Sequence, residues 1–182
     1  MILKKLFIAA IFFLLLSAIN NFAQEIKERT ETIISESFGK DVNFTFWKYT
    51  LPPNTKRKIE NTVKQKFFKD WLYVYNISIK DSAIAFGFLD NVIGKSMPIT
   101  FFVLIDVKGI IISTNIIKYR EPYGGAVSND NWNEQFSGKN SSSDFTVGRS
   151  VYGISGATIS VNSVTKGIRK IALLYEEIKD DI

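Results

Sequence analysis

The residues best suited to chemistry are a run of small and hydroxyl-bearing side chains ahead of a long amphipathic segment: Gly153-Ile154-Ser155-Gly156-Ala157-Thr158-Ile159-Ser160. Ser155 is suited to cap the following helix, with its oxygen accepting the amide hydrogen of Thr158. Gly156 and Ala157 leave room for a ligand to approach the first-turn backbone. Unpaired amides and the helix dipole favour a phosphate there, and Thr158 and Ser160 add hydroxyls. The run predicts an anion site; the alternative is an ordinary capped helix with small packing residues.

The composition restricts which chemistry is available. Among 182 residues there is no Cys and no His. This excludes disulfides, catalytic thiols, iron–sulfur clusters, imidazole ligands for haem or zinc, and Ser-His-Asp catalysis. Reactions must therefore depend on carboxylates, hydroxyls, Lys or Arg, or a bound cofactor. We predict no metal site and no catalytic residues.

A closing helix over residues 155–178 would position this run. Its apolar residues recur at spacings of three and four and predict one continuous buried stripe: Val161, Val164, Ile168, Ile171, Tyr175 and Ile178.

Upstream, the patterning predicts two helices followed by a group of strands. The helices are expected over 25–38, ending at Gly39, and from Asn54 or Thr55 to about Trp71. Strands are expected over 42–49, 72–79, 83–89, 99–106 and 109–119, with a hairpin turn at 106–109 and a short helix at 131–136. Strands grouped in this way indicate an α+β fold, a mostly antiparallel twisted sheet packed with helices and closed by the C-terminal amphipathic helix.

The second predicted helix carries many cations on its polar face: Lys56, Arg57, Lys58, Lys64, Lys66 and Lys69. A solvated helix face explains this pattern most simply, and an anionic docking surface is the alternative.

The first residues resemble an export signal. A short basic start is followed by an apolar run over 6–19, shorter than the roughly 20 residues of a bilayer span. Ala23 then offers a cleavage point. We predict a signal peptide over 1–23, a single domain over 24–182, and a location in the bacterial periplasm or envelope; an uncleaved anchor is the alternative. Removing 1–23 removes two Lys and no acid, which lowers the net charge from +5 to +3 and argues against nucleic-acid binding.

Ser155-Gly156-Ala157-Thr158, followed by Ile159-Ser160, resembles the flavinylation signature of the FMN-binding domain family. That family includes the extracytoplasmic FMN-carrying subunits of sodium-pumping NADH:quinone reductase and of the Rnf complex. The resemblance implies that a flavin transferase attaches FMN to Thr158 by a phosphoester. Ser155, Gly156 and Ala157 would then form the phosphate turn, with Ser160 beside it.

The resemblance extends over roughly residues 80–175. Glu121-Pro122-Tyr123-Gly124 stands where the family has a loop beside the flavin, which implies cofactor contacts from Glu121, Tyr123 and Gly124. Trp132 and Phe136 lie in a segment that also resembles the family. Tyr123, Trp132 and Phe136 are candidates to contact the ring, and core packing explains each of them equally well.

One position departs from the signature, because Tyr152 stands where the family usually has Asp. A module that binds FMN or another phosphate ligand reversibly is therefore one alternative to covalent attachment. A second alternative is a cofactor-free envelope interaction protein whose basic helix over 54–71 docks on an acidic partner or a lipid.

The leading hypothesis is an exported, covalent flavoprotein of electron transport, a carrier or redox subunit rather than a stand-alone enzyme. Its expected partners are a flavin transferase, an envelope redox partner and a membrane-bound electron-transport complex, with no nucleic acid. The protein would position the flavin and tune its potential, since the redox chemistry belongs to the cofactor.

Overall fold

The structure of the protein is a computed structural model that describes residues 24–39 and 41–182. The predicted signal peptide lies outside the described residues, and a single domain over 24–182 stays a prediction. Residues 41–182 form one compact unit. Within the described residues, no helix has the length and apolar character that crossing a bilayer requires.

The first described segment is a helix over residues 24–38, close to the predicted range. It ends at Gly39, whose φ of +86° is a left-handed conformation that glycine adopts without strain. The Gly39 amide donates to the carbonyl of Ser35, which closes the last turn.

Residues 41–182 are organised around a five-stranded antiparallel sheet with the strands in sequence order. The strands are β1 (Asn43–Thr50), β2 (Trp71–Ile79), β3 (Ser82–Ile93), β4 (Pro98–Asp106) and β5 (Ile111–Lys118). The predicted turn between β4 and β5 is present, since Gly109 has a φ of +86° and its amide donates to the Asp106 carbonyl. The α+β prediction is confirmed.

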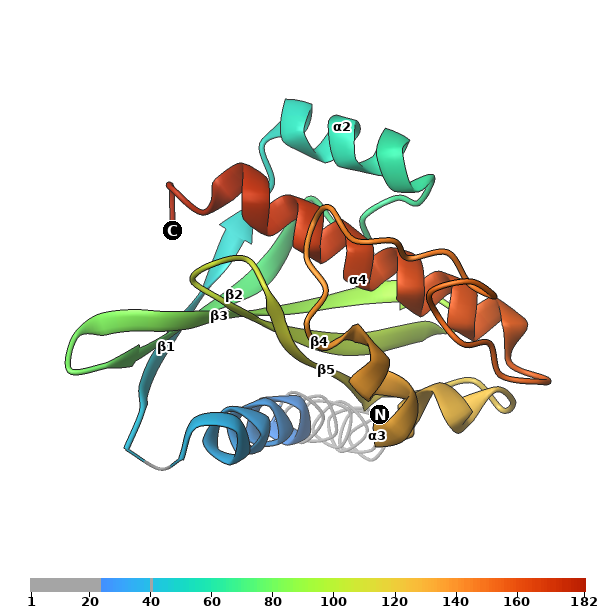
Figure 1. Cartoon of the computed structure of the whole chain (residues 1–182), viewed down its shortest axis with the longest axis horizontal. Helices are drawn as coiled ribbons and strands as arrows, with labels where there is room; N and C mark the ends of the chain where they lie inside the picture. Colours follow the sequence, from blue (N-terminus) through green and yellow to red (C-terminus); the bar gives the residue numbers. More distant parts are fainter. Residues whose placement is uncertain (1–23, 40) are drawn as a thin grey trace, which may run out of the picture. The chain divides into compact units, whose positions relative to one another are not determined.

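The C-terminal helix, α4 (Thr158–Ile178), lies along one face of this sheet (Figure 1). Every residue of the predicted stripe is at most 2% exposed. A Cβ at Gly167 would come within 2.7 Å of a Val92 methyl and 3.0 Å of the Phe101 ring. The glycine therefore allows α4 to approach β3 and β4 closely.

Helix α2 (Pro53–Val63) packs on α4 on the side away from the sheet (Figure 1). The prediction that it reaches Trp71 from an Asn54 or Thr55 cap is wrong. Pro52 occupies the N-cap without a side-chain bond, and the helix ends where Lys64 turns left-handed at a φ of 55°. Beyond it, the Phe67 amide donates to Glu60 Oε1 at 2.8 Å and Phe67 is buried, so the chain leaves the helix to reach the core.

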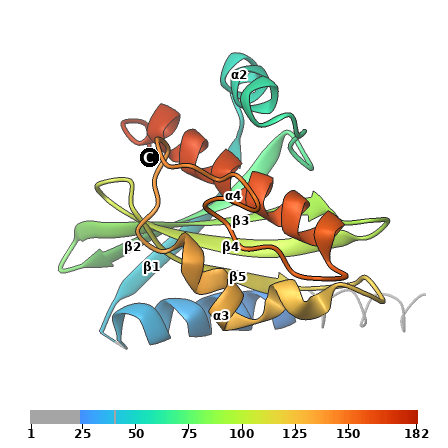
Figure 2. The same ribbon diagram turned by 45° about the vertical axis from the view of Figure 1, so that its right-hand side comes forward.

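Three short helices follow the sheet and pack beside β5 (Figure 2). They are η1 (Gly125–Ser128), α3 (Asp130–Asn133) and η2 (Glu134–Phe136), in agreement with the predicted short helix at 131–136. Trp132 and Phe136 from this region enter the hydrophobic core, with their rings edge to face at 5.2 Å.

Candidate functional site

The start of α4 borders a pocket of about 460 Å³, within the roughly 300–1,000 Å³ usual for small-molecule sites. Three segments meet there: the turn between β3 and β4, the loop after β5, and the start of α4. The lining residues are Lys95, Ser96, Glu121, Pro122, Tyr123, Gly124, Gly156, Ala157, Thr158, Ile159 and Ser160. All the predicted cofactor residues except Ser155 line this pocket.

The start of α4 carries no side-chain cap. The expected cap by Ser155 is wrong, because the N-cap is Ala157 and no side chain bonds the first turn. The chain turns at Gly156, whose φ is +76°, and the Ala157 amide donates to the Ile154 carbonyl at 3.1 Å. This turn places Ser155 before the helix. The first-turn amides of a 21-residue helix are thereby left to a ligand, and the positive end of the dipole favours an anionic one.

Thr158 is exposed at this end of the helix. Its carbonyl accepts a hydrogen bond from Asn162 Nδ2 at 2.8 Å. Among the hydrogen bonds of the described residues, none uses the Thr158 hydroxyl. A bond to this oxygen can therefore form without loss of an internal contact.

Glu121 orders one wall of the pocket. Its Oε1 accepts the amides of Ser96 at 2.6 Å and Met97 at 2.8 Å, and its Oε2 accepts the Ser96 hydroxyl at 3.2 Å. The amides of Met97 and Ser96 hold the pKa of this carboxyl below its ordinary value. A Cβ at Gly94 would lie 2.7 Å from Glu121 Oε1, so a glycine there admits the carboxylate. Glu121 thus holds the Lys95 turn in place.

Tyr119, which sequence reasoning did not select, ties the loop after β5 to α4. Its hydroxyl donates to the Tyr123 carbonyl and lies 2.8 Å from Ser160 Oγ. Gly124 has a φ of +82°, and a Cβ there would be 2.8 Å from the Tyr119 hydroxyl. The Tyr119 hydroxyl thus joins the Tyr123 carbonyl to the buried Ser160 hydroxyl. These contacts hold the loop after β5 against the first turn of α4.

Tyr119→Phe is expected to lower the free energy of unfolding by about 1 kcal/mol, because the substitution leaves the Tyr123 carbonyl and Ser160 hydroxyl without this partner. Urea denaturation measures the change. Tyr73→Phe on β2 is the control, since no hydrogen bond in the described part of the chain uses that hydroxyl. Equal effects of the two substitutions would show that the Tyr119 bonds do not hold the loop.

The three candidates for ring contact occupy different environments. Tyr123 is 84% exposed at the pocket rim, whereas Trp132 and Phe136 are buried in the core. Trp132 Nε1 donates to the Tyr152 carbonyl at 2.8 Å. Tyr152 itself is 80% exposed and does not line this pocket. Of the three, only Tyr123 is placed to contact a ligand in the pocket.

Lys95 is a pocket residue that the sequence did not identify as part of the site. It lies in the turn between β3 and β4, 63 positions before Thr158 in the numbering. Because Lys95 lines the same pocket as the start of α4, its ammonium is available to pair with an anion bound there. Gly94-Lys95 is recognisable in the sequence as part of a turn, but nothing in the sequence shows that this turn faces α4.

The donor set of this pocket fits FMN. Uncapped amides and Lys95 suit the phosphate, the Thr158 hydroxyl lies at the same end, and Tyr123 and Ile159 offer exposed apolar surface for a ring. The family model of the FMN-binding domain matches residues 94–172, which include every lining residue of the pocket. Among curated proteins, none matches the chain. The resemblance to the FMN-binding domain family is therefore confirmed over residues 94–172, and this match indicates FMN as the cofactor.

Proposed function

We propose that this protein is an exported electron-transfer flavoprotein whose FMN is attached through its phosphate to Thr158. The observation that carries the proposal is the exposed, unbonded Thr158 hydroxyl at the uncapped start of α4, in the same pocket as Lys95. The donor would be a flavin dinucleotide held by a flavin transferase: the bond from Thr158 Oγ to the flavin-side phosphorus would form as the hydroxyl loses its proton, and the phosphoanhydride bond would break with release of a nucleoside monophosphate.

The residues of the pocket bind and orient the cofactor. The first-turn amides of α4 and the Lys95 ammonium balance the phosphate charge, while Glu121 and Tyr119 hold the two flanking loops. Tyr123 and Ile159 shield part of the ring from water. FMN supplies the redox chemistry when it is bound.

A carrier or redox subunit suits this site better than a stand-alone enzyme. The pocket stands open at the surface, and the exposed Tyr123 and Ile159 would leave a ring edge accessible to a partner. Export is supported by the sequence of residues 1–23, and a covalent bond would retain the cofactor in the envelope. The proposed partners are a flavin transferase and an envelope redox protein, the latter within a membrane-bound electron-transport complex.

Intact mass of the exported protein, produced together with a flavin transferase, tests the proposal. We expect the mature chain to gain the mass of one FMN less water, and the gain to remain with the peptide that contains Thr158 after digestion. An unmodified mass from a sample that contains active transferase would contradict covalent attachment.

Reversible FMN binding is the second candidate, favoured by Tyr152 in the position where the family signature usually has Asp. A denaturing gel separates the two proposals. Covalent flavin fluorescence stays with the protein band, whereas reversibly bound flavin leaves it.

A further inference from the structure

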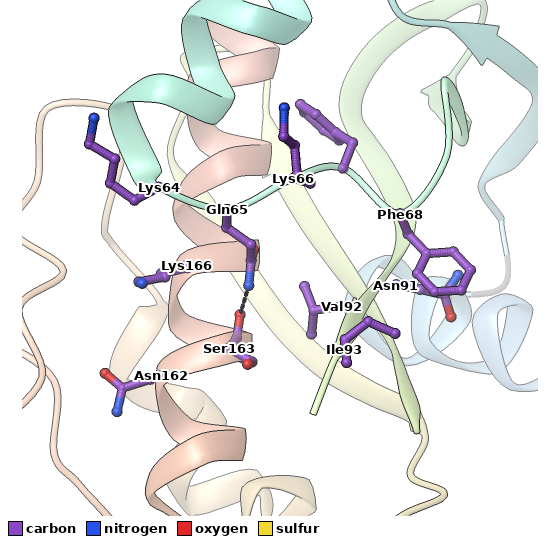
Figure 3. A pocket seen from close by; sticks show the side chains of 11 residues that line it. Lys64, Gln65, Lys66, Phe68, Asn91, Val92, Ile93, Asn162, Ser163 and Lys166 are labelled. Atoms are coloured by element: carbon purple, nitrogen blue, oxygen red, sulfur yellow. Dashed lines mark hydrogen bonds between the residues drawn. The ribbon is translucent and has the colours of Figure 1, made fainter. Parts of the chain in front are cut away.

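A second pocket, of about 540 Å³, lies where the chain leaves α2 (Figure 3). The segment 64–68, the end of β3 and the first turns of α4 enclose it. Most of its lining residues precede residue 94 and so lie outside the part of the chain that matches the FMN-binding domain. The FMN-binding function does not account for this pocket.

The floor of the pocket is apolar and partly exposed. Val92 and Ile93 lie side by side at its centre in Figure 3, with Phe68 beyond them. Ile93 is 49% exposed and Phe68 is 39% exposed. Large apolar side chains gathered in a recess are typical of a surface that a partner covers.

Opposite this floor, polar groups of the backbone and side chains are held in place. Gln65 Nε2 donates to the Ser163 carbonyl at 3.0 Å, which joins the segment after α2 to α4 (Figure 3). Asn162 lines the pocket on this side too, whereas Asn91 lines it from β3, the strand that carries Val92 and Ile93 (Figure 3). No hydrogen bond of the described residues uses Asn91 Nδ2 or Asn162 Oδ1, so these two atoms can donate to and accept from the backbone of an extended peptide.

The margin of the pocket is cationic. Lys64, Lys66 and Lys166 line it, and no carboxylate does (Figure 3). Lys66 Nζ is 3.1 Å from the buried Glu60 Oε2, whereas the ion pairs of the described residues include neither Lys64 nor Lys166. Two ammonium groups therefore remain for an external anion.

We propose that this pocket, the Lys64–Lys166 groove, docks an acidic segment of a partner protein through an apolar side chain flanked by carboxylates. The side chain enters against Val92 and Ile93, and the carboxylates meet Lys64 and Lys166. A protein segment fits better than a membrane, because the apolar groups are recessed between segment 64–68, β3 and α4, while a lipid surface requires them to protrude. Complementary charge of this kind accelerates encounter and selects partners.

The groove lies close to the flavin site along α4. Asn162 lines the groove and donates to the carbonyl of Thr158, one helical turn earlier. A partner seated in the groove would thus lie beside the pocket at the start of α4. Docking itself requires no flavin, so its test is independent of the proposed function.

Fluorescence anisotropy with a labelled peptide, one Phe flanked on both sides by Glu residues, tests the docking. Lys64→Glu/Lys166→Glu is compared with Lys80→Glu/Lys108→Glu, which changes the net charge equally at exposed turns. Those turns lie at the opposite end of β3 and β4 from the groove. We expect the groove pair to weaken binding at least about tenfold and the turn pair at most about twofold, at low salt.

Ile93→Ser and a peptide with Ser in place of Phe test the apolar part. Each should weaken binding by about fivefold, and the combination should be no worse than either alone because both remove the same contact. Thermal unfolding checks that the variants fold. If Lys64→Glu/Lys166→Glu does not fold, Lys64→Gln/Lys166→Gln takes its place, and we expect it to weaken peptide binding by a smaller factor.

Equal weakening by the groove and turn pairs would overturn the proposal, since net charge alone would then explain binding. Failure of the unsubstituted protein to prefer the Phe peptide over the Ser peptide would overturn it as well. A third result would also overturn it: the unsubstituted protein binds phosphatidylglycerol vesicles but not the peptide, and Lys64→Glu/Lys166→Glu abolishes the vesicle binding. The groove would then serve a membrane.

Discussion

Thr158→Ala is expected to abolish covalent FMN attachment, because the substitution removes the hydroxyl to which we propose that FMN is attached. The rest of the pocket at the start of α4 stays intact. The side chain is exposed and makes no internal hydrogen bond in the described structure, so the fold should be retained. Intact mass and in-gel flavin fluorescence after co-expression with the transferase measure the loss.

Two substitutions serve as controls for this result. Thr158→Ser keeps an acceptor oxygen and is expected to retain attachment, whereas Thr62→Ala removes an exposed hydroxyl from α2, outside the pocket, and should leave attachment unchanged. Ser160 is unsuited to replace Thr158, since its hydroxyl is buried against Tyr119. A Thr158→Ala protein that still carries denaturation-resistant flavin would show that another residue is modified.

Lys170→Met is expected to destabilise the protein by about 3–5 kcal/mol, because the substitution leaves Asp90 buried without its cation. Lys170 is fully buried, with its Nζ 3.3 Å from Asp90 Oδ2, 3.1 Å from the Lys66 carbonyl and 4.3 Å from the centre of the Phe67 ring. The contact to Asp90 is an ion pair without hydrogen-bond geometry, since Oδ2 accepts no hydrogen bond within the described residues. Urea unfolding at neutral pH measures the loss.

The loss should shrink as the pH falls. Burial raises the pKa of Asp90 above its ordinary value, and removal of Lys170 takes away the charge that opposes this shift. The folded state then binds a proton more tightly than the unfolded state, so stability falls as the pH rises from the ordinary aspartate range through the raised pKa. Lys170→Met should therefore cost less at about pH 5 than at neutral pH.

Lys166→Met, one turn earlier on α4 and exposed, is the matched control and should change stability by less than about 0.5 kcal/mol. Asp90→Asn combined with Lys170→Met should recover part of the loss, since no buried charge remains without a partner. A Lys170→Met protein as stable as the Lys166→Met control would show that the pair does not support the fold.

Local patterning was sufficient for those elements whose signals lie within a few residues of one another. The spacing of apolar residues in α4 identified its buried stripe, and the turn residues around Gly109 identified a hairpin, because both signals depend on neighbours within a few positions. The Ser155–Thr158 run likewise indicated an anion site at the start of a helix, although its capping residue was assigned wrongly.

Tertiary structure decided what these patterns could not. Lys170 lies outside the predicted apolar stripe of α4, so its spacing gives no sign that it is buried. It is buried because the sheet covers one side of α4, while α2 and residues 66–67 cover the other. The early end of α2 follows from the burial of Phe67, a contact outside any local pattern.

The sequence by itself determined the α+β class, the absence of Cys and His chemistry, and the place of the Ser155–Thr158 run at the start of a long amphipathic helix, since each depends on composition or on short-range spacing. Only the tertiary structure brought Lys95 and Thr158 to one pocket, joined Tyr119 to Ser160, and brought Lys64 and Lys166 to the lining of a second pocket. Contacts between residues far apart in the chain depend on strand register and helix packing, and these depend on the whole core rather than on any single segment.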